Sequence, residues 1–384
     1  MQGIDDIKLS ADMMSALNKA EEGQSIVKSI DYTRPLNEYP TVQKIAEFLR
    51  MRVKHENVKT DSLQFGGRVV CDSMEKYLEN EGLSSSMLKA TLKTPLHFEF
   101  ALSDDKEELE KLRDPKYFNL GTFLHQCILE PTKFSRVIVE PDFKLSSHEG
   151  CDVGIAFYEG LCEERGIAYP NVPYESLQTK KNYIEALKKA ADVQPVSEEH
   201  NLKIKVLKRH IDHYGGGIIK RLLTHAKREI SIYHTDTESG LRLKVRPDAI
   251  QFKENIGVDA IISIKSTACE DLQAFYSNAA KLHYDLSEGM YQEVVSAATG
   301  RDFNTTIMIM LQTVPPFAVA VLVWSGEDIE MGKHKFRVAL QNAKEIIEKK
   351  STKGYEVYSE DGHLGLIEMS LPRWNQTERL PQNI

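Results

Sequence analysis

Residues 229–267 constrain the fold more than any other part of the chain, because they hold three short stretches with β-strand character. EISIYHT (229–235) and LRLKVRPDAI (241–250) alternate polar and apolar residues and are separated by the turn-forming sequence DTESG, which predicts a hairpin. The apolar stretch VDAIISIK (258–265) follows after a short turn at 253–257. Helices are predicted from about residue 267 and over 285–299, then strands in TTIMIMLQTV and FAVAVLVW, and a helix over 325–350. This order predicts an α/β fold, a mixed sheet flanked by helices.

The segment before these strands is predicted to be helical. Ser84 is a good N-cap for a helix that ends near Pro95, and NLGTFLHQCILEP predicts a second helix that ends at Pro131. Residues 145–228 also have helical patterns. Residues 1–82 are predicted to be a separate, mostly helical region of unassigned role, with an amphipathic stretch at 42–53 and a break at Gly66-Gly67.

Composition excludes several classes of protein. The 384 residues are 41% hydrophobic and 28% charged, an ordinary globular balance. The start MQGIDDIK lacks the features of a secretory leader, and the longest apolar run, 317–324, is far too short to span a bilayer, so we expect a cytoplasmic protein without membrane association. The odd number of cysteines, five, without a CxxC pair argues against a disulfide framework and a zinc site.

A carboxylate and a lysine lie close to the ends of two of the predicted strands. Asp248 lies seventeen residues before Lys265. Because side chains alternate along a strand, Ser263 and Lys265 share one face, while Ile262 and Ile264 are expected to enter the core. Two acids and a lysine on adjacent strands would suit magnesium-dependent phosphodiester hydrolysis, since magnesium prefers carboxylate ligands and polarises the phosphate.

Each of these signals is weak by itself. An Arg-Pro-Asp sequence is more often a turn, a lysine that ends a strand is more often a charged edge, and a histidine such as His125 on an apolar helix is more often a core residue than a ligand. Only their order along the chain, with strands between them, favours a site.

The segment 201–228 is the most basic part of the chain. Its eight cations face one acid, Asp212, for a formal charge of +7, and Gly215-Gly216-Gly217 divides it. A solvated helix surface is the more common explanation of such a run. The alternative is a surface that follows DNA phosphates, and the candidates for it, with Arg246, are Lys203, Lys205, Lys208, Arg209, Lys220 and Arg221.

From about residue 84 to 374 the chain resembles the RecE-type exonucleases (exodeoxyribonuclease VIII), a branch of the PD-(D/E)xK nuclease superfamily. The resemblance rests on pieces that occur in the family's order. They are SSSMLKATLKTP, GTFLHQCILEPTKFSRVIVEPDF, SIYHTDTESGLRLKVRPDAI, IISIKSTA, YDLSEGMY and MSLPRW. It implies a nuclease domain over residues 83–384.

The resemblance also implies roles for individual residues. His125, Asp248 and the backbone carbonyl of Ile264 would be metal ligands, Lys265 would orient or activate the attacking water, and Tyr291 would match the last tyrosine of the family's YHxQxxxY helix. The implied activity is Mg²⁺- or Mn²⁺-dependent digestion of duplex DNA from its ends in phage-type recombination. The implied partners are a strand-annealing protein and further copies of the chain in a ring-like oligomer.

Two positions depart from the family pattern. Ser263 stands where the second aspartate is expected, and Ser287 replaces the glutamine of the tyrosine-containing helix. Asp259 is four residues from Ser263, roughly 13 Å along a strand, and Glu270 is explained as a capping box with Thr267. Glu288 is the better candidate for a migrated acid, as in restriction endonucleases that take the acid from the following helix.

Two functions therefore remain open. One is an active exodeoxyribonuclease with a rebuilt site. The other is a nuclease fold that has lost catalysis and binds DNA or a protein. A purely protein-directed role of the N-terminal helices is a third hypothesis.

Overall fold

The computed structural model describes residues 33–51, 54–103 and 120–370. The helices are α2 (Val42–Arg50), α3 (Met74–Glu79), α4 (Ser85–Thr91), α5 (Pro95–Leu102), α7 (Leu120–Leu129), α8 (His148–Glu164), α9 (Leu177–Ala191), α10 (Glu198–His213), α11 (Ile218–Leu223), α12 (Lys253–Ile256), α13 (Leu272–Lys281), α14 (Tyr284–Thr299) and α15 (Gly326–Lys349). The strands are β1 (Gly67–Val70), β2 (Val137–Val139), β3 (Gln194–Val196), β4 (Lys227–Arg228), β5 (Ser231–Thr235), β6 (Arg242–Val245), β7 (Ala249–Gln251), β8 (Asp259–Thr267), β9 (Phe303–Gln312) and β10 (Val319–Val323).

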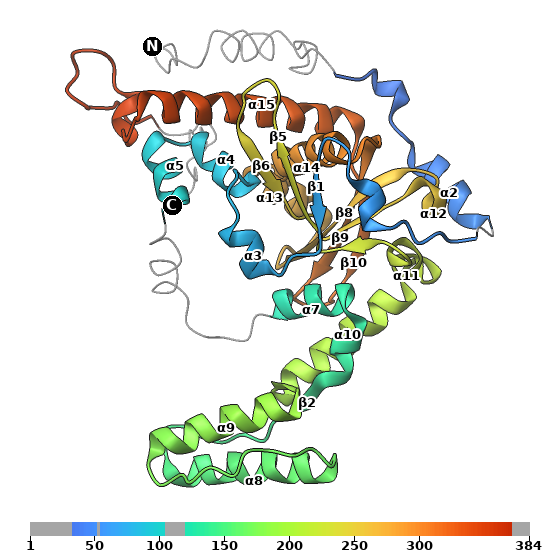
Figure 1. Cartoon of the computed structure of the whole chain (residues 1–384), viewed down its shortest axis with the longest axis vertical. Coiled ribbons are helices and arrows are strands. Elements are labelled where there is room, and N and C mark those ends of the chain that lie inside the picture. The colour runs from blue at the N-terminus through green and yellow to red at the C-terminus, as the bar shows by residue number, and fades with distance from the viewer. Residues whose placement is uncertain (1–32, 52–53, 104–119, 371–384) are drawn as a thin grey trace, which may run out of the picture.

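A five-stranded mixed sheet forms the centre of the molecule (Figure 1). Its order is β10-β9-β8-β7-β4, with β8 and β9 parallel and the other neighbours antiparallel. The long strands β8 and β9 are almost wholly buried, which explains their near-continuous apolar sequences. The predicted α/β fold with a mixed sheet and flanking helices is confirmed.

Alternation along β8 sends its side chains into two separate apolar layers. Ile261 packs with Leu286 of α14 and Phe336 of α15 on one face. Ile262 and Ile264 pack on the other face, in the layer formed with α7, α10 and α11. The predicted burial of Ile262 and Ile264 is therefore confirmed, and Ser263 and Lys265 are left on the face that α14 covers.

A second sheet, of order β1-β5-β6, lies beside the first (Figure 1). It contains the predicted hairpin β5–β6 and a strand, β1, that the sequence did not predict. β1 begins at Gly67, where a Cβ would lie 2.4 Å from the Tyr233 carbonyl oxygen. The glycine that was interpreted as a break is thus needed for the close approach of two strands.

The described part of residues 1–82 packs into the main body and is not a separate unit. Leu63 and Val69 are 1% exposed and belong to the same apolar layer as Ile261. Residues 1–32 lie outside the described part, so the prediction that this stretch is helical stays a prediction.

Most predicted helix boundaries hold, with one clear exception. Ser84 caps α4 as expected, and Pro95 both ends that segment and opens α5. The helix predicted from Thr267 begins instead at Leu272, because Thr267 is still part of β8 and Asp271 is the N-cap that accepts from the Ala274 N–H at 2.7 Å. The predicted capping box with Glu270 is therefore wrong.

The helices α8 and α9 form a hairpin that projects from the body, with α10 leading back to the sheet (Figure 1). The hairpin has its own small core around Ile155, Tyr158 and Leu187. None of the described helices is both long enough and apolar enough to cross a bilayer.

The crossing of α14 and α15 depends on two glycines. A Cβ on Gly332 would lie 2.1 Å from the Asp285 carbonyl oxygen, and one on Gly289 would lie 2.5 Å from the Lys333 nitrogen. We expect Gly332→Ala to destabilise the protein by about 1–3 kcal/mol, because neither backbone can move away without strain. The matched control is Gly160→Ala in α8, where a Cβ meets nothing within 4 Å and the change should be neutral or slightly stabilising. Thermal melts of both variants check this, and an unchanged melting temperature for Gly332→Ala would show that the crossing is looser than described.

Candidate active site at the end of strand β8

A buried carboxylate faces the serine that replaces the expected aspartate. The Ser263 hydroxyl lies 2.8 Å from both Oε1 and Oε2 of Glu288, so it can donate to that carboxylate. Glu288 is 0% exposed and Ser263 is 1% exposed. Helix α14 thus supplies a carboxylate, Glu288, next to position 263 of strand β8, where the chain itself has a serine. This placement agrees with the prediction that Glu288 is the better candidate for a migrated acid.

Asp248 lies directly before β7 and joins two elements. Its Oδ2 accepts a hydrogen bond from the Ile264 N–H, and its Oδ1 lies 3.0 Å from Nε2 of His125 on α7. Both side chains stay partly exposed, at 19% and 27%. Because the N–H and C=O of one strand residue point toward the same neighbouring strand, the Ile264 carbonyl also faces the Asp248 side. The structure therefore brings His125, Asp248 and Ile264 together.

Lys265 extends from the same face of β8 as Ser263. Its Nζ lies 5.4 Å from the centre of the Tyr284 ring, at the start of α14. Asp248 and Glu288 both act on it electrostatically. The predicted lysine and the two carboxylates therefore lie around one end of β8.

The ionisation of these groups follows from burial and mutual charge. Burial raises the pKa of Asp248, but the His125 hydrogen bond and the Lys265 charge outweigh it, so the pKa lies below the ordinary aspartate value. Burial lowers the pKa of Lys265, and Asp248 and Glu288 more than reverse this. Burial raises the pKa of Glu288, and Lys265 and Ser263 oppose this only in part. Asp248 is thus the anion of the site, and Glu288 is the carboxyl group that resists ionisation.

Tyr291 lies in α14, two residues after Gly289, and is close to Glu288. Burial, and then the Glu288 charge, raise the pKa of Tyr291, while a hydrogen bond with the Ser85 side chain acts in the other direction. The phenol therefore keeps its proton at physiological pH. It can serve as a hydrogen-bond donor but not as a base.

The donor atoms suit a hard divalent cation, although they are not grouped as a ready cluster. Within residues 33–51, 54–103 and 120–370, no three His, Cys, Asp or Glu side chains are placed closely enough to hold a metal as they stand. His125 and Asp248 contact each other, and Glu288 contacts Ser263. One imidazole nitrogen, two carboxylates and a carbonyl are nevertheless the ligand types that Mg²⁺ and Mn²⁺ accept. A cation would replace these direct contacts with bonds to itself.

The other acids considered from the sequence are not part of the site. Asp259 is held by Arg301, with Nη2 at 2.6 Å from Oδ1, and it also accepts from the Lys253 N–H. Glu270 is exposed, and Ser287 is buried beside Glu288 on α14.

The predicted DNA-binding cations lie mainly on α10 and α11, and two of them form ion pairs along the helix. Lys203 pairs with Glu199 and Lys208 pairs with Asp212, each one turn away along the helix. The exposed members of the set are Lys205, Lys208, Arg209, Lys220 and Arg221. The opposite, apolar faces of α10 and α11 pack in the same layer as Ile262 and residues of α7, the helix that carries His125. A phosphate-binding role for these cations stays a prediction.

Arg246 has structural contacts that account for its position. Its Nη1 donates to the Asp72 carbonyl at 2.9 Å and to the Ser231 hydroxyl at 2.8 Å, and its guanidinium lies 6.0 Å from the centre of the Tyr77 ring. These contacts tie the RPD turn to β5 and to the segment before α3.

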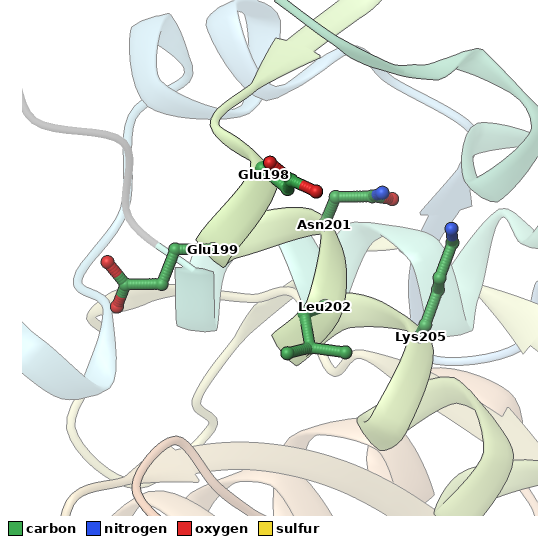
Figure 2. A pocket seen from close by; sticks show the side chains of 5 residues that line it. All are labelled: Glu198, Glu199, Asn201, Leu202 and Lys205. Carbon is green, nitrogen blue, oxygen red and sulfur yellow. The ribbon is translucent and has the colours of Figure 1, made fainter.

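A surface hollow of about 310 Å³ lies at the beginning of α10, and none of its lining residues is His125, Asp248, Lys265 or Glu288. Figure 2 shows the side chains that line it, all from one helix: Glu198, Glu199, Asn201, Leu202 and Lys205. Two carboxylates beside one ammonium make a poor site for a DNA phosphate, so we assign no function to this hollow.

Two residues near the site were not found from the sequence. Lys89 of α4 lies with its Nζ 5.6 Å from the centre of the Tyr284 ring, and Lys265 and Glu288 act on it electrostatically. Lys89 lies four residues after Ser85, so the two side chains share one face of α4. This shared face is the only indication in the sequence that Lys89 lies near the site. Tyr284 begins the YDLSEGMY motif but had been given no role.

A mixed sheet with an Asp-containing turn, a lysine at the end of its central strand and a carboxylate beside it define a PD-(D/E)xK-type nuclease fold. A family model described as a PDDEXK-like domain of unknown function (DUF3799) matches residues 84–357. The chain belongs to this family.

Similar solved structures share little sequence with the chain. One, from Eubacterium rectale and provisionally named an exonuclease, is 12% identical, with a TM-score of 0.39, and the match covers 81% of this chain and 100% of that one. Another, the protein SSO0001, is 14% identical, with a TM-score of 0.23, and the match covers 61% and 87%. A search of curated protein sequences finds no match.

Proposed function

We propose that this protein is a divalent-metal-dependent deoxyribonuclease that degrades linear duplex DNA from its ends. The observation that carries the proposal is the Glu288 carboxylate, 2.8 Å from the Ser263 hydroxyl. It supplies, from α14, the second acid that a PD-(D/E)xK site needs next to its lysine. Without it, the serine would leave a neutral and weaker oxygen in that place.

The residues that would hold a cation are His125, Asp248, Glu288 and the Ile264 carbonyl. A bound Mg²⁺ or Mn²⁺ would polarise the phosphate and favour ionisation of water. Lys265, whose ammonium interacts electrostatically with Asp248 and Glu288, orients the attacking water and offsets negative charge as it develops on the phosphate. Tyr291 keeps its proton, and its phenol can donate a hydrogen bond beside Glu288.

The motif resemblance extends the proposal to the exodeoxyribonuclease VIII type. On this basis the substrate is a duplex end, the cofactor is Mg²⁺ or Mn²⁺, and the biological setting is phage-type recombination. A single-strand annealing protein and a ring-like homo-oligomer are the partners that the resemblance suggests.

One observation favours the alternative, a nuclease fold that binds DNA or a protein without cutting. His125 bonds Asp248 directly, and Ser263 can donate to both oxygens of a buried Glu288 whose pKa is raised. A site closed in this way would hold no cation. This alternative predicts salt-sensitive DNA binding and no metal-dependent product.

The decisive experiment compares linear with covalently closed circular duplex DNA in Mg²⁺, Mn²⁺ and EDTA. We expect digestion of linear DNA only, in either metal, and a loss of at least about a hundredfold in Lys265→Ala, since one preorganised charge at the reacting phosphate contributes roughly that much. Lys281→Ala, an exposed lysine at the end of α13, is the matched control. Wild-type protein that gives no product at any concentration would leave the binding module as the correct function.

A further inference from the structure

Two ammonium groups converge on one tyrosine beside the candidate active site. The Nζ atoms of Lys265 and Lys89 lie 5.4 Å and 5.6 Å from the centre of the Tyr284 ring. Lys265 comes from strand β8, Lys89 comes from helix α4, and Tyr284 begins α14. Three elements that are distant in sequence therefore bring two positive charges to one place.

The carboxylates around this pair are committed to other groups. Asp248 binds His125, Glu288 faces Ser263, and Asp285 pairs with Lys335 at 2.5 Å. Among the described residues, no carboxylate oxygen lies within the 4.0 Å of an ion pair from the Nζ of Lys89 or of Lys265. Within the described part of the chain, the two cations thus lie near a tyrosine ring and each other without a direct counter-ion.

Holding Lys89 in this position has a cost. Burial, and then the neighbouring Lys265 charge, lower the pKa of Lys89 to about 8. An anion placed between the two ammonium groups would remove this cost, because it neutralises both charges at once. A DNA phosphate has the charge and the oxygen acceptors that such a place requires.

We propose that Lys89 binds a non-bridging oxygen of the DNA phosphate at the cleavage centre, opposite Lys265. The inference rests on the proposed nuclease function and adds a substrate-binding residue to it. The ring of Tyr284 lies near both ammonium groups and helps to orient both side chains.

The test measures DNA binding without catalysis. A fluorescein-labelled linear duplex of about 20 base pairs is titrated in EDTA, by anisotropy, at several salt concentrations. We expect Lys89→Met to weaken binding about tenfold and to lower the slope of log Kd against log salt by about 1, as for the loss of one phosphate contact. Lys89→Arg should retain most of the affinity because it keeps the charge. Lys93→Met, which removes an exposed lysine from the segment that follows the same helix, is the matched control and should change neither value.

The outcomes separate this inference from the proposed function. Wild-type protein that binds and digests DNA, with Lys89→Met equal to it in Kd and salt slope, would overturn the role of Lys89 alone. Wild-type protein that neither binds nor digests linear DNA would overturn both. Thermal melts show whether Lys89→Met is folded, and Lys89→Gln replaces it if it is not.

Discussion

Glu288→Gln is expected to reduce metal-dependent digestion of linear duplex DNA by at least about a hundredfold. The substitution keeps the shape of the side chain and an oxygen for the Ser263 hydroxyl, but it removes the negative charge that Ser263 cannot supply. Loss of groups that only support a metal site typically costs about ten- to a hundredfold, so loss of a ligand should cost at least as much. Initial rates in Mg²⁺ and Mn²⁺ measure the effect.

The same variant should melt at a higher temperature than wild type near pH 7.5 in EDTA. Burial raises the pKa of Glu288 in the folded state above its value in the unfolded state. At a pH between these two pKa values, the folded state therefore binds more protons than the unfolded state. Stability is therefore lost as pH rises through the folded pKa. Glutamine does not ionise and escapes this loss. At about pH 3, well below the ordinary glutamate pKa, Glu288 is protonated in both states and the advantage should disappear.

Added Mn²⁺ provides a second readout. It should raise the melting temperature of wild type and have no effect on Glu288→Gln, because a ligand stabilises only a folded state that binds it. Glu348→Gln, the same substitution on the exposed surface of α15, is the control. Full nuclease activity in Glu288→Gln would show that the acid of the site lies elsewhere.

Ser263→Asp alone is expected to destabilise the protein by about 3 kcal/mol or more. Although it recreates the DxK sequence, it places a second carboxylate against a Glu288 that is 0% exposed, and an uncompensated buried charge costs roughly this much. Urea melts at pH 7.5 measure the change. The naive expectation that an aspartate at position 263 improves the site is therefore reversed by the structure.

Moving the acid instead of adding one should restore function. The double variant Ser263→Asp/Glu288→Ser moves the carboxylate from α14 to β8. We expect it to be at least about tenfold more active than Glu288→Ser alone, with stability close to wild type. Such coupling is expected of residues in direct contact. If the double variant is no better than Glu288→Ser in either property, the two positions do not share one role.

Local pattern was enough to predict the strand that carries the site. The alternation in VDAIISIK placed Ser263 and Lys265 on one face and Ile262 and Ile264 in the core, and the structure has them so. The predicted hairpin, the helices α14 and α15 and the α/β class also follow from short-range patterns. The site residues His125, Asp248 and Lys265 follow from motifs that resemble those of a known family.

Other features depend on contacts that no local pattern reveals. β1 is four residues long, and it exists because it pairs with β5, which lies more than 160 residues later. The helix expected from Thr267 starts later because β8 continues along β9 to Gln312. Lys89 is an ordinary surface lysine in sequence, and only the packing of α4 against α14 and α15 brings it to Tyr284.

By itself, the sequence determined which side chains share a face of β8, because strand geometry repeats every two residues. The resemblance to a known family implied that one acid is missing at position 263. Only the tertiary structure decided that Glu288 takes the empty place. That position depends on how α14 packs over the sheet, through Leu286 and Met290 against the layer of Ile261, and helix-on-sheet packing is set by the complete core rather than by any single segment.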